Sequence, residues 1–385
     1  MRWYADLHIH SKYSLATSPR MDLETIALWA EKKGLSVVAT GDALHPKWLS
    51  QISKTLQETD RGLFSFPKCT IQFILQTEVA TIYKKEGKTR KIHHLIFFPD
   101  LQSVKKLSKR LKTFGKLHSD GRPILSMSSE DLLDAVLEVG AFLIPAHIWT
   151  PWYGVLGAKS GFDSIEECYG ERACDIPAIE TGLSSDPPMN RRVSSLDCYS
   201  LISASDAHCP ERMGRNATVF SCERSFAAIK AAIQKGASTL ELFPEAGKYF
   251  FDGHRKCDLS LSPKEAKRGN NICPCCRKSL TLGVLHRVEE LVNRRRPKAT
   301  SCSYHVPLLD LLSQLLGYTT HSKKVFVLYE ELISKIGSEL YILHDAPIEK
   351  MKKYPQLAKA ITKIRGGRVS KEPGFDGKYG VISLS

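Results

Sequence analysis

Ligand-type side chains repeatedly follow short apolar runs in the first 250 residues of this chain. The first case is Asp6-Leu7-His8-Ile9-His10, where strand geometry would place the alternate residues Asp6, His8 and His10 on one face. Later apolar runs are followed by further polar residues: Asp42 and His45 after 36–40, Glu78 after 71–77, His147 after 141–145, and Asp206 and His208 after 201–204. His94 instead opens the run 94–98. In a barrel of parallel strands, the strand ends and the loops after them form one catalytic face. The pattern therefore predicts such a barrel with an active site at that face.

Amphipathic segments alternate with these apolar runs. In residues 22–33, apolar side chains recur at helical spacing and Gly34 supplies a stop signal. Similar helical patterns cover 101–116, 129–139 and 225–235, the last ending at Gly236. We therefore expect an α/β fold over residues 1–246, with a barrel of eight strands or fewer.

The candidate ligands are imidazoles and carboxylates, which suit divalent zinc, manganese, iron or magnesium. They are too many for one ion, so two or three ions are expected. Glu78 and Asp206 are the expected bridging carboxylates, and we choose His94 over His93 because neighbouring strand residues face opposite ways. A centre of this kind suits hydrolysis of phosphate esters, with His8, His10, Glu78 and Asp206 as the catalytic group.

The net charge of +14 is concentrated in the C-terminal third. Residues 1–250 contain 31 Lys and Arg against 28 Asp and Glu, whereas residues 251–385 contain 24 against 13. This asymmetry favours a polyanionic partner, with nucleic acid first. No apolar run approaches the ~18 residues of a membrane span, so we expect a cytoplasmic, nucleoid-associated protein. In a reducing compartment, clustered cysteines are expected to bind metal instead of forming disulfides.

Residues 247–300 carry a motif typical of a structural zinc site, followed by a basic segment. Two half-sites with two-residue spacers are separated by fifteen residues: His254 with Cys257, and Cys273 with Cys276. A helix is expected from 280 to 296, ending in Arg294-Arg295-Arg296, which either grips DNA phosphates or is a solvated helix end. Residues 301–385 are expected to be a basic, mainly helical region.

The loop that follows His147 is rich in aromatic residues. Trp149, Trp152 and Tyr153 either pack this loop against the barrel or stack on a nucleic-acid base. The sequence leaves both alternatives open.

The motifs around Asp6-Leu7-His8-Ile9-His10, Glu78, His94, His147 and Ser205-Asp206-Ala207-His208 resemble those of the polymerase and histidinol phosphatase (PHP) family of phosphoesterases. This resemblance implies a distorted (β/α)7 barrel with three metal sites. His8, His10, Glu78 and Asp206 match the first site, and His94 and His147 the second. His208 with Asp42 or His45 is expected at the third, although Ala16 stands where the family often has another histidine.

The barrel motifs together with the zinc motif and the C-terminal tail resemble the endonuclease Q family over essentially the whole chain. That resemblance implies a DNA-repair nuclease that nicks duplex DNA, and by extension single-stranded DNA, 5′ to hypoxanthine, uracil, xanthine or an abasic site. A small-molecule phosphatase of the PHP family and a non-catalytic DNA-binding accessory protein are the alternatives. A small-molecule phosphatase leaves the zinc motif and the basic C-terminal third unexplained. A non-catalytic accessory protein does not need so complete a set of metal ligands.

Overall fold

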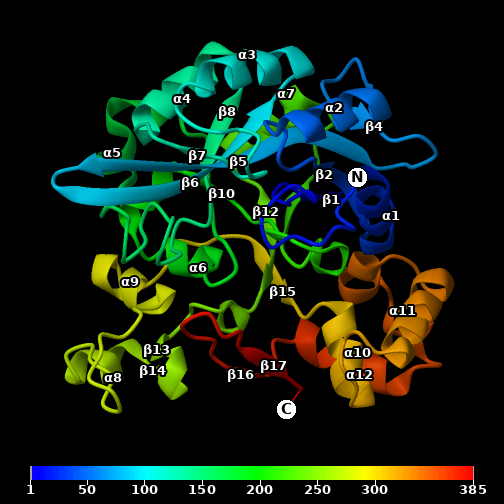
Figure 1. Cartoon of the computed structure of the whole chain (residues 1–385). Helices are drawn as coiled ribbons and strands as arrows, with labels where there is room; N and C mark the ends of the chain where they lie inside the picture. The colour runs from blue at the N-terminus through cyan, green and yellow to red at the C-terminus, as the bar shows by residue number, and fades with distance from the viewer. Residues whose placement is uncertain (1, 385) are drawn as a thin grey trace.

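A mixed β-sheet forms the centre of the molecule in the computed structural model, which describes residues 2–384 (Figure 1). Its main path runs β15-β12-β11-β1-β2-β5 and continues from β5 through β6 to β8. The bounds are β1 (Trp3–Asp6), β2 (Leu35–Ala39), β5 (Gln72–Lys85), β6 (Lys88–Phe98), β8 (Phe142–Pro145), β11 (Ala217–Phe220), β12 (Ser238–Leu242) and β15 (Cys302–His305). Short strands β3 (Gln57–Glu58), β4 (Phe64–Ser65) and β7 (Ile124–Leu125) extend this sheet, while β9 (Ala178–Glu180) and β10 (Ser200–Ile202) form a separate parallel pair.

The α/β class is confirmed, but the sheet departs from a ring of parallel strands. β1, β2 and β5 are parallel, whereas β6 is antiparallel to β5 and to β8, and β11 is antiparallel to β1. The cause at β5 and β6 is a two-residue turn in which Glu86 and Gly87 both have positive φ, 55° and 74°. Such a turn joins antiparallel strands directly, so no crossover helix separates them. Glu78 consequently lies in the middle of a long strand instead of at a strand end.

Helices cover the outside of the sheet. In α1 (Leu23–Lys33), Asp22 caps the first turn by accepting from the Thr25 amide, and Gly34 ends the helix with φ of 86°. The helices expected from the sequence are present as α3 (Leu101–Leu111), α4 (Ser129–Glu138) and α7 (Phe226–Lys235). Shorter helices are α2 (Pro46–Thr55), α5 (Ile165–Tyr169) and α6 (Pro187–Asn190).

The residues around the zinc motif form a small unit with its own core of Ala266, Cys273 and Leu280. Its elements are β13 (Asp252–His254), β14 (Leu259–Leu261), α8 (Pro263–Arg268) and α9 (Val284–Leu291). Helix α9 is shorter than expected, so the three arginines lie beyond it. The Arg294 guanidinium pairs with Asp197 at 2.7 Å, which directs the chain back toward the N-terminal α/β part after the helix has ended.

The C-terminal region is joined to the N-terminal α/β part through the sheet. β15 pairs in parallel with β12, and α10 (Leu308–Leu316), α11 (Lys323–Lys335) and α12 (Pro355–Arg365) share the hydrophobic core of the α/β part. A buried ion pair of 2.7 Å links Lys33 of α1 to Glu339, which also accepts from the Tyr329 hydroxyl. The tail closes with the hairpin of β16 (Ser370–Glu372) and β17 (Val381–Ser383). No helix within residues 2–384 is long and apolar enough to cross a membrane.

Candidate metal centre

The loops after β1 and β10 bring the first ligands together. His10 donates its amide to the Ala207 carbonyl at 3.0 Å, which aligns the two loops. Asp6 does not join the cluster, because its carboxylate accepts from the amides of Ser205 (3.0 Å) and Gly214 (2.8 Å). Asp6 therefore positions the loop that carries Asp206.

Three buried side chains, His8, His10 and Glu78, and the partly exposed Asp206 converge beyond the carboxyl end of β1. The Nε2 atom of His10 lies 3.2 Å from both Glu78 Oε2 and Asp206 Oδ1. His8 Nε2 lies 3.7 Å from the same Glu78 oxygen and 3.6 Å from Asp206 Oδ1. The structure thus brings together the four residues expected to form the catalytic group.

Three atoms of this group are buried without a hydrogen-bond partner: His8 Nε2, His10 Nε2 and Asp206 Oδ1. Buried polar atoms almost always have a partner, because an unsatisfied one costs about 1–3 kcal/mol. Here the unpartnered atoms point at one another and combine two imidazole nitrogens with a carboxylate oxygen. That donor set and its convergence fit a divalent cation.

A second group forms around the other oxygen of Glu78. Glu78 Oε1 lies 2.7 Å from His93 Nδ1 and 3.2 Å from His147 Nε2, and the two imidazoles are 3.3 Å apart. One carboxylate therefore faces two sets of histidines, with one oxygen toward each. This is the arrangement expected of a bridging ligand.

The expectation for His94 is corrected by the register of β5 against β6. His93 lies opposite Ala80, two residues from Glu78, so His93 and Glu78 share a face, whereas His94 lies opposite Val79 on the other face. There the His94 ring bonds to the Tyr169 hydroxyl at 2.7 Å and to Thr81 Oγ1 at 2.9 Å. His94 is thus a buried packing residue, and His93 takes its place in the cluster.

A third group contains His10, Asp206 and His208. The rings of His10 and His208 have centroids 4.4 Å apart, and His208 Nδ1 is 3.7 Å from Asp206 Oδ1. Asp42 and His45 belong to no candidate ligand group within residues 2–384, which corrects the expectation that one of them joins His208.

Asp42 supports a ligand from behind, whereas His45 lies away from the cluster. Asp42 lies 3.1 Å from His10 Nδ1 and accepts from the Ser11 amide, so it orients the imidazole whose other nitrogen faces the cluster. His45 stacks on Tyr13 and bonds to the His118 carbonyl.

Glu180 and Arg122 are further residues of the site that the sequence pattern did not predict. Glu180 is buried and lies 2.9 Å from His8 Nδ1, while its other oxygen accepts from the His147 amide at 2.7 Å. It therefore orients ligands of both groups. Glu180 ends the apolar run 176–179, so the pattern used for the other ligands could have found it. Arg122, which places a guanidinium 3.2 Å from Glu78 Oε2, lies in a loop with no such signal.

The charges of the cluster are strongly coupled. Burial raises the pKa of Glu78, but His93 and Arg122 outweigh it and lower that pKa well below its ordinary value. Burial lowers the pKa of His8, yet the Glu180 and Asp206 carboxylates raise it well above its ordinary value. The protonated form of His8 is therefore favoured, and a bound cation would displace that proton.

Backbone strain also marks the site. Asp42, His147 and Asp206 have positive φ values of 47°, 28° and 48°. Non-glycine residues in this region cost free energy and cluster at functional sites.

The four residues of the zinc motif meet as expected. His254, Cys257, Cys273 and Cys276 place one ligand atom each within 4.8 Å of one another, whereas Cys275 is exposed and outside the group. Burial raises the pKa of Cys273, but the backbone amides of Cys276 and Cys275 lower it to about 7. A set of three sulfurs and one imidazole fits zinc.

The residues expected to contact DNA lie in different environments, some buried and some exposed. Trp149 is buried and donates to Asn190 at 2.8 Å, so it packs the loop and is not available for a base. Trp152 is 38% exposed, and the Tyr153 ring lies over His93 at 4.2 Å. Arg294 is engaged with Asp197, whereas Arg295 and Arg296 are exposed.

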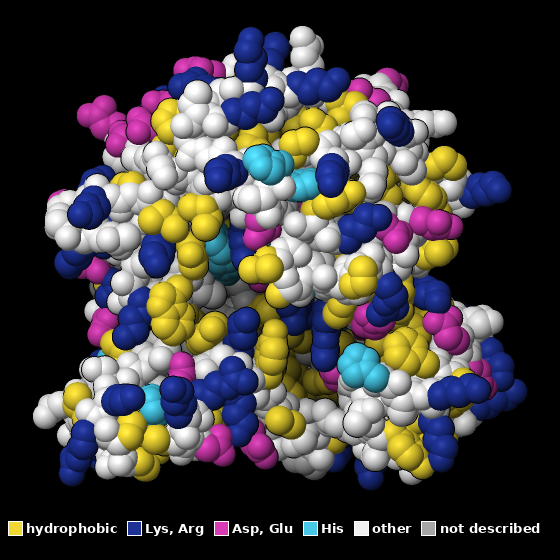
Figure 2. All heavy atoms as spheres, viewed as in Figure 1, with side chains coloured by type: hydrophobic (Ala, Val, Ile, Leu, Met, Phe, Trp, Pro, Cys, Tyr) yellow, Lys and Arg dark blue, Asp and Glu magenta, His cyan; other side chains and the backbone are white. Residues whose placement is uncertain are grey.

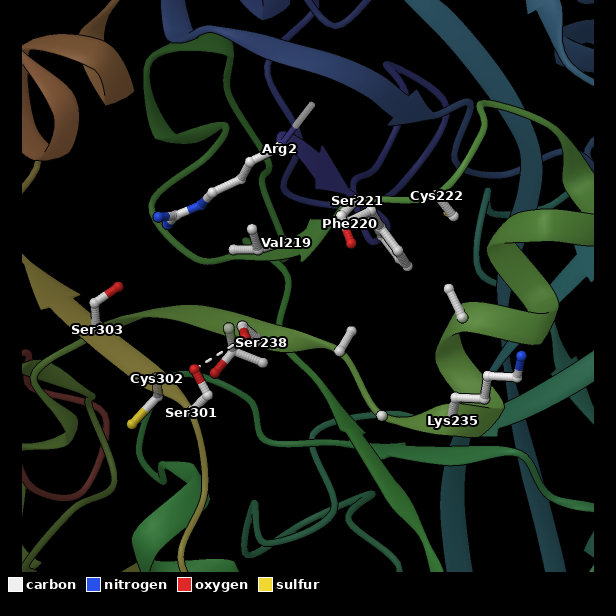
Figure 3. Close-up of a pocket in the computed structure, with 14 residues that line it drawn as sticks. Arg2, Val219, Phe220, Ser221, Cys222, Lys235, Ser238, Ser301, Cys302 and Ser303 are labelled. Carbon is white, nitrogen blue, oxygen red and sulfur yellow. Dashed lines mark hydrogen bonds between the residues drawn. The ribbon is translucent and has the colours of Figure 1, made fainter.

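The surface is hollowed between the N-terminal α/β part and the two C-terminal parts. Figure 2 shows this hollow with Lys and Arg side chains around it. A separate pocket of about 660 Å³ lies at the amino end of β1, between β11, β12 and β15, and so away from the metal cluster. Figure 3 shows Arg2 reaching over that pocket and Ser238 bonded to Ser301.

The fold and the cluster define the class of the protein as a metal-dependent phosphoesterase, with its candidate metal ligands beyond the carboxyl end of β1. Comparison with known structures identifies the family. The lesion-specific endonuclease PfuEndoQ from Pyrococcus furiosus is 32% identical, with a TM-score of 0.89 over 100% of this chain and 96% of that one. Endonuclease Q in complex with a 27-mer duplex carrying an abasic lesion is 31% identical, with a TM-score of 0.90 over 100% of this chain and 97% of that one. The chain belongs to the endonuclease Q family.

Sequence comparisons match the whole chain or parts of it. YqxK of Bacillus subtilis is 28% identical over 98% of both chains. MJ0043 of Methanocaldococcus jannaschii is 34% identical over 250 residues, which are 61% of this chain but 31% of that protein. The family model of the MJ0043 C-terminal domain matches residues 307–368, the region of α10 to α12.

Proposed function

We propose that this protein is a DNA-repair endonuclease that hydrolyses the phosphodiester 5′ to deaminated bases or abasic sites. The observation that carries the proposal is the full-length likeness to a lesion-specific endonuclease and to endonuclease Q in complex with lesion-bearing duplex DNA. The preference for hypoxanthine, uracil and xanthine comes from the family resemblance.

Catalysis depends on divalent metal ions in this proposal. His8, His10, Glu78 and Asp206 would hold one ion, Glu78 with His93 and His147 a second, and His208 with His10 and Asp206 a third. When bound, zinc, manganese or magnesium would supply an acidified water and positive charge for the leaving oxygen. A structural zinc would be held by His254 and the three cysteines of its group.

The chain itself orients the centre and neutralises charge. Glu180 and Asp42 hold the outward nitrogens of His8 and His10, so the inward nitrogens keep a constant direction. The Arg122 guanidinium lies beside Glu78 and retains a partly exposed side chain. It is therefore available to pair with an oxygen of the scissile phosphate.

Duplex DNA is the proposed partner, and single-stranded DNA a further one. Support comes from the basic C-terminal third and from the exposed arginines after α9. Such an enzyme would act at the nucleoid, in the cytoplasm.

The test uses labelled duplexes that carry one uracil, one hypoxanthine, one abasic site or no lesion, with and without a chelator. We expect a single nick 5′ to each lesion, no nick in the intact duplex, and loss of cleavage on chelation that added Mn²⁺ or Zn²⁺ restores. Asp206→Asn should be inactive. Asp310→Asn is the matched control, because Asp310 pairs with Arg212 outside the cluster.

Equal cleavage of intact and lesion duplexes would refute the lesion specificity. Hydrolysis of small phosphate monoesters without any cleavage of DNA would support the small-molecule phosphatase instead. Binding of lesion DNA without hydrolysis of either substrate would support the accessory protein.

A further inference from the structure

Two pockets adjoin each other at the amino end of β1, away from the metal cluster beyond its carboxyl end. The first has a volume of about 660 Å³ and the second of about 510 Å³. Arg2, Cys302 and Ser303 line both pockets, so the two form one continuous hollow. We refer to them together as the basal groove.

Small side chains leave the first pocket open. It lies where β11 ends and where β12 and β15 begin, with Val219 paired to Ser238 and Thr239 to Cys302. The end of α7 covers one side, and there Gly236 stops the helix with φ of 97°. The lining includes these small residues from the strands and the helix: Ser221, Ala232, Ala237, Ser238, Ser301 and Cys302.

The lining of the basal groove is positively charged. It contains one carboxylate, that of Asp345, and three cations: Arg2 in both pockets, Lys235 in the first and Arg365 in the second. The Asp345 carboxylate already accepts from the Tyr4 hydroxyl at 2.9 Å. The groove therefore attracts an anion from solution.

The three cations retain donors for such an anion. Arg2 and Lys235 are exposed, and neither forms an ion pair with an acid of the described chain. Arg365 donates from Nε and Nη2 to the carbonyl oxygens of Leu343, Ile342 and Ala346. Its Nη1 has no hydrogen-bond partner among residues 2–384, so one edge of the guanidinium is free.

The basic groups of the second pocket lie close enough to repel one another. Burial lowers the pKa of His344, and the neighbouring charges of His305, Arg2 and Arg365 lower it further. Like charges held together in this way cost free energy, which an anion bound between them would offset.

Hydroxyl groups lie between the cations of the first pocket. Figure 3 shows Arg2 and Lys235 on opposite sides of this pocket, with the bonded pair Ser238 and Ser301 between them. The two hydroxyl oxygens are 2.9 Å apart. Whichever of them donates, the hydrogen of the other remains available to an acceptor. The pocket thus offers neutral donors as well as charge.

Guanidinium, ammonium and hydroxyl groups are the donors that bind phosphate oxygens. Cations spread along two adjoining pockets suit a ligand with more than one phosphate, since a single phosphate cannot reach them all. The volume of the first pocket is within the ~300–1,000 Å³ of small-molecule sites. A double helix is too wide to enter it.

We propose that the basal groove is a binding site for a small molecule that carries a diphosphate group. Arg2 and Lys235 bind this group from opposite sides, and Arg365 extends the site into the second pocket. The site goes beyond the proposed cleavage of DNA and does not depend on it, because none of the candidate metal ligands lines the groove.

The test is a calorimetric titration of the full-length, metal-loaded protein with ADP and with pyrophosphate. Excess Mg²⁺ prevents the ligands from removing metal ions, and each titration is run with and without saturating intact duplex DNA. We expect one molecule of ADP or pyrophosphate per chain, and affinities that the duplex leaves within about twofold.

Arg2→Ala and Lys235→Ala should each weaken the binding of both ligands at least tenfold, because each removes a charged donor to the phosphates. Both residues are exposed, so the thermal midpoint and the cleavage of lesion DNA should not change. Lys230→Ala is the matched control. Lys230 belongs to the same helix but lies over the Phe142 ring and does not line the groove.

A third variant tests the volume of the pocket instead of its charge. Ala232→Phe places a large ring in the first pocket and should also weaken ADP binding at least tenfold. Absence of binding at about 1 mM of either ligand, or wild-type affinity in both Arg2→Ala and Lys235→Ala, would overturn the proposal. Competition between ADP and intact duplex would overturn it too, since the anion would then bind on the DNA-binding surface. Failure of the proposed function would appear separately, as absence of lesion cleavage by the wild type.

Discussion

Replacing His93 or His94, the neighbouring histidines of β6, by alanine in two separate variants gives the sharpest test of the metal centre. His93 Nδ1 lies 2.7 Å from Glu78 Oε1, in contact with the ring of His147, whereas His94 faces Tyr169 and Thr81 on the other side of the strand. The two variants differ by one position and by one imidazole. They should nevertheless fail in different ways.

His93→Ala should lose one bound metal ion and most of the activity. Removing an outer partner of a metal ligand costs about 10–100-fold in affinity, and removing the ligand itself should cost at least as much. If the ion at this position supplies about 4 kcal/mol of transition-state stabilisation, its loss slows cleavage about 10³-fold. Folding should be little affected, because the neighbouring carboxylate and imidazole remain paired with each other.

His94→Ala should instead lose stability while keeping its metal ions. The variant leaves the buried Tyr169 hydroxyl without its 2.7 Å partner and opens a cavity, which together should cost about 2–4 kcal/mol in the free energy of unfolding. Burial lowers the pKa of His94 to about 3, so the residue is neutral at working pH and its loss changes no charge.

The assay measures metal content, single-turnover cleavage of an abasic duplex and the thermal midpoint for both variants. Cleavage by His94→Ala is measured at least 20 °C below its midpoint, so that unfolding does not enter the rate. The reasoning fails if His94→Ala loses metal and activity while His93→Ala keeps both. That result would mean that the register of β6 against β5 is shifted by one residue.

Three further outcomes are expected. Asp206→Asn and His8→Ala should each abolish detectable cleavage but keep DNA affinity within several-fold, because the DNA-binding surface extends far beyond the cluster; retained nicking would contradict the assignment of the centre. Cys273→Ser should release the structural zinc, lower the thermal stability of residues 247–300 and weaken DNA binding, since metal binding supplies much of the folding free energy of so small a unit; unchanged zinc content would show the motif to be incidental. Arg295→Ala and Arg296→Ala should each weaken binding similarly for intact and lesion duplexes and reduce the salt dependence of log K by about 0.9; a lesion-specific loss would place them at the damaged base instead.

Much of the centre could be predicted because ligand type and local period are properties of the sequence. His8 and His10 alternate on one strand-like stretch, Asp206 and His208 follow an apolar run, and the zinc half-sites have a diagnostic spacing. Glu180 carries the same signal, because it follows the apolar run 176–179.

The strand direction could not be predicted with the same rules. A Glu86-Gly87 turn makes β5 and β6 an antiparallel hairpin, so the sheet is mixed where parallel strands were expected. The length of β5 also moves Glu78 from a strand end to the middle of the sheet. An apolar run alone does not show at which of its two ends the strand continues.

The sequence by itself determined which chemical groups the protein can offer: imidazoles and carboxylates for divalent ions, a Cys and His motif for zinc, and a basic C-terminal third for a polyanion. Only the tertiary structure decided which of them meet. The choice of His93 over His94 depends on the pairing of Ala80 with His93, since a shift of one residue reverses every side chain of a strand. The path of the C-terminal tail depends on backbone hydrogen bonds, such as that of Gly374 N to Glu245 O, with a segment more than 120 residues earlier. Both are long-range relations, and local periodicity contains no information about them.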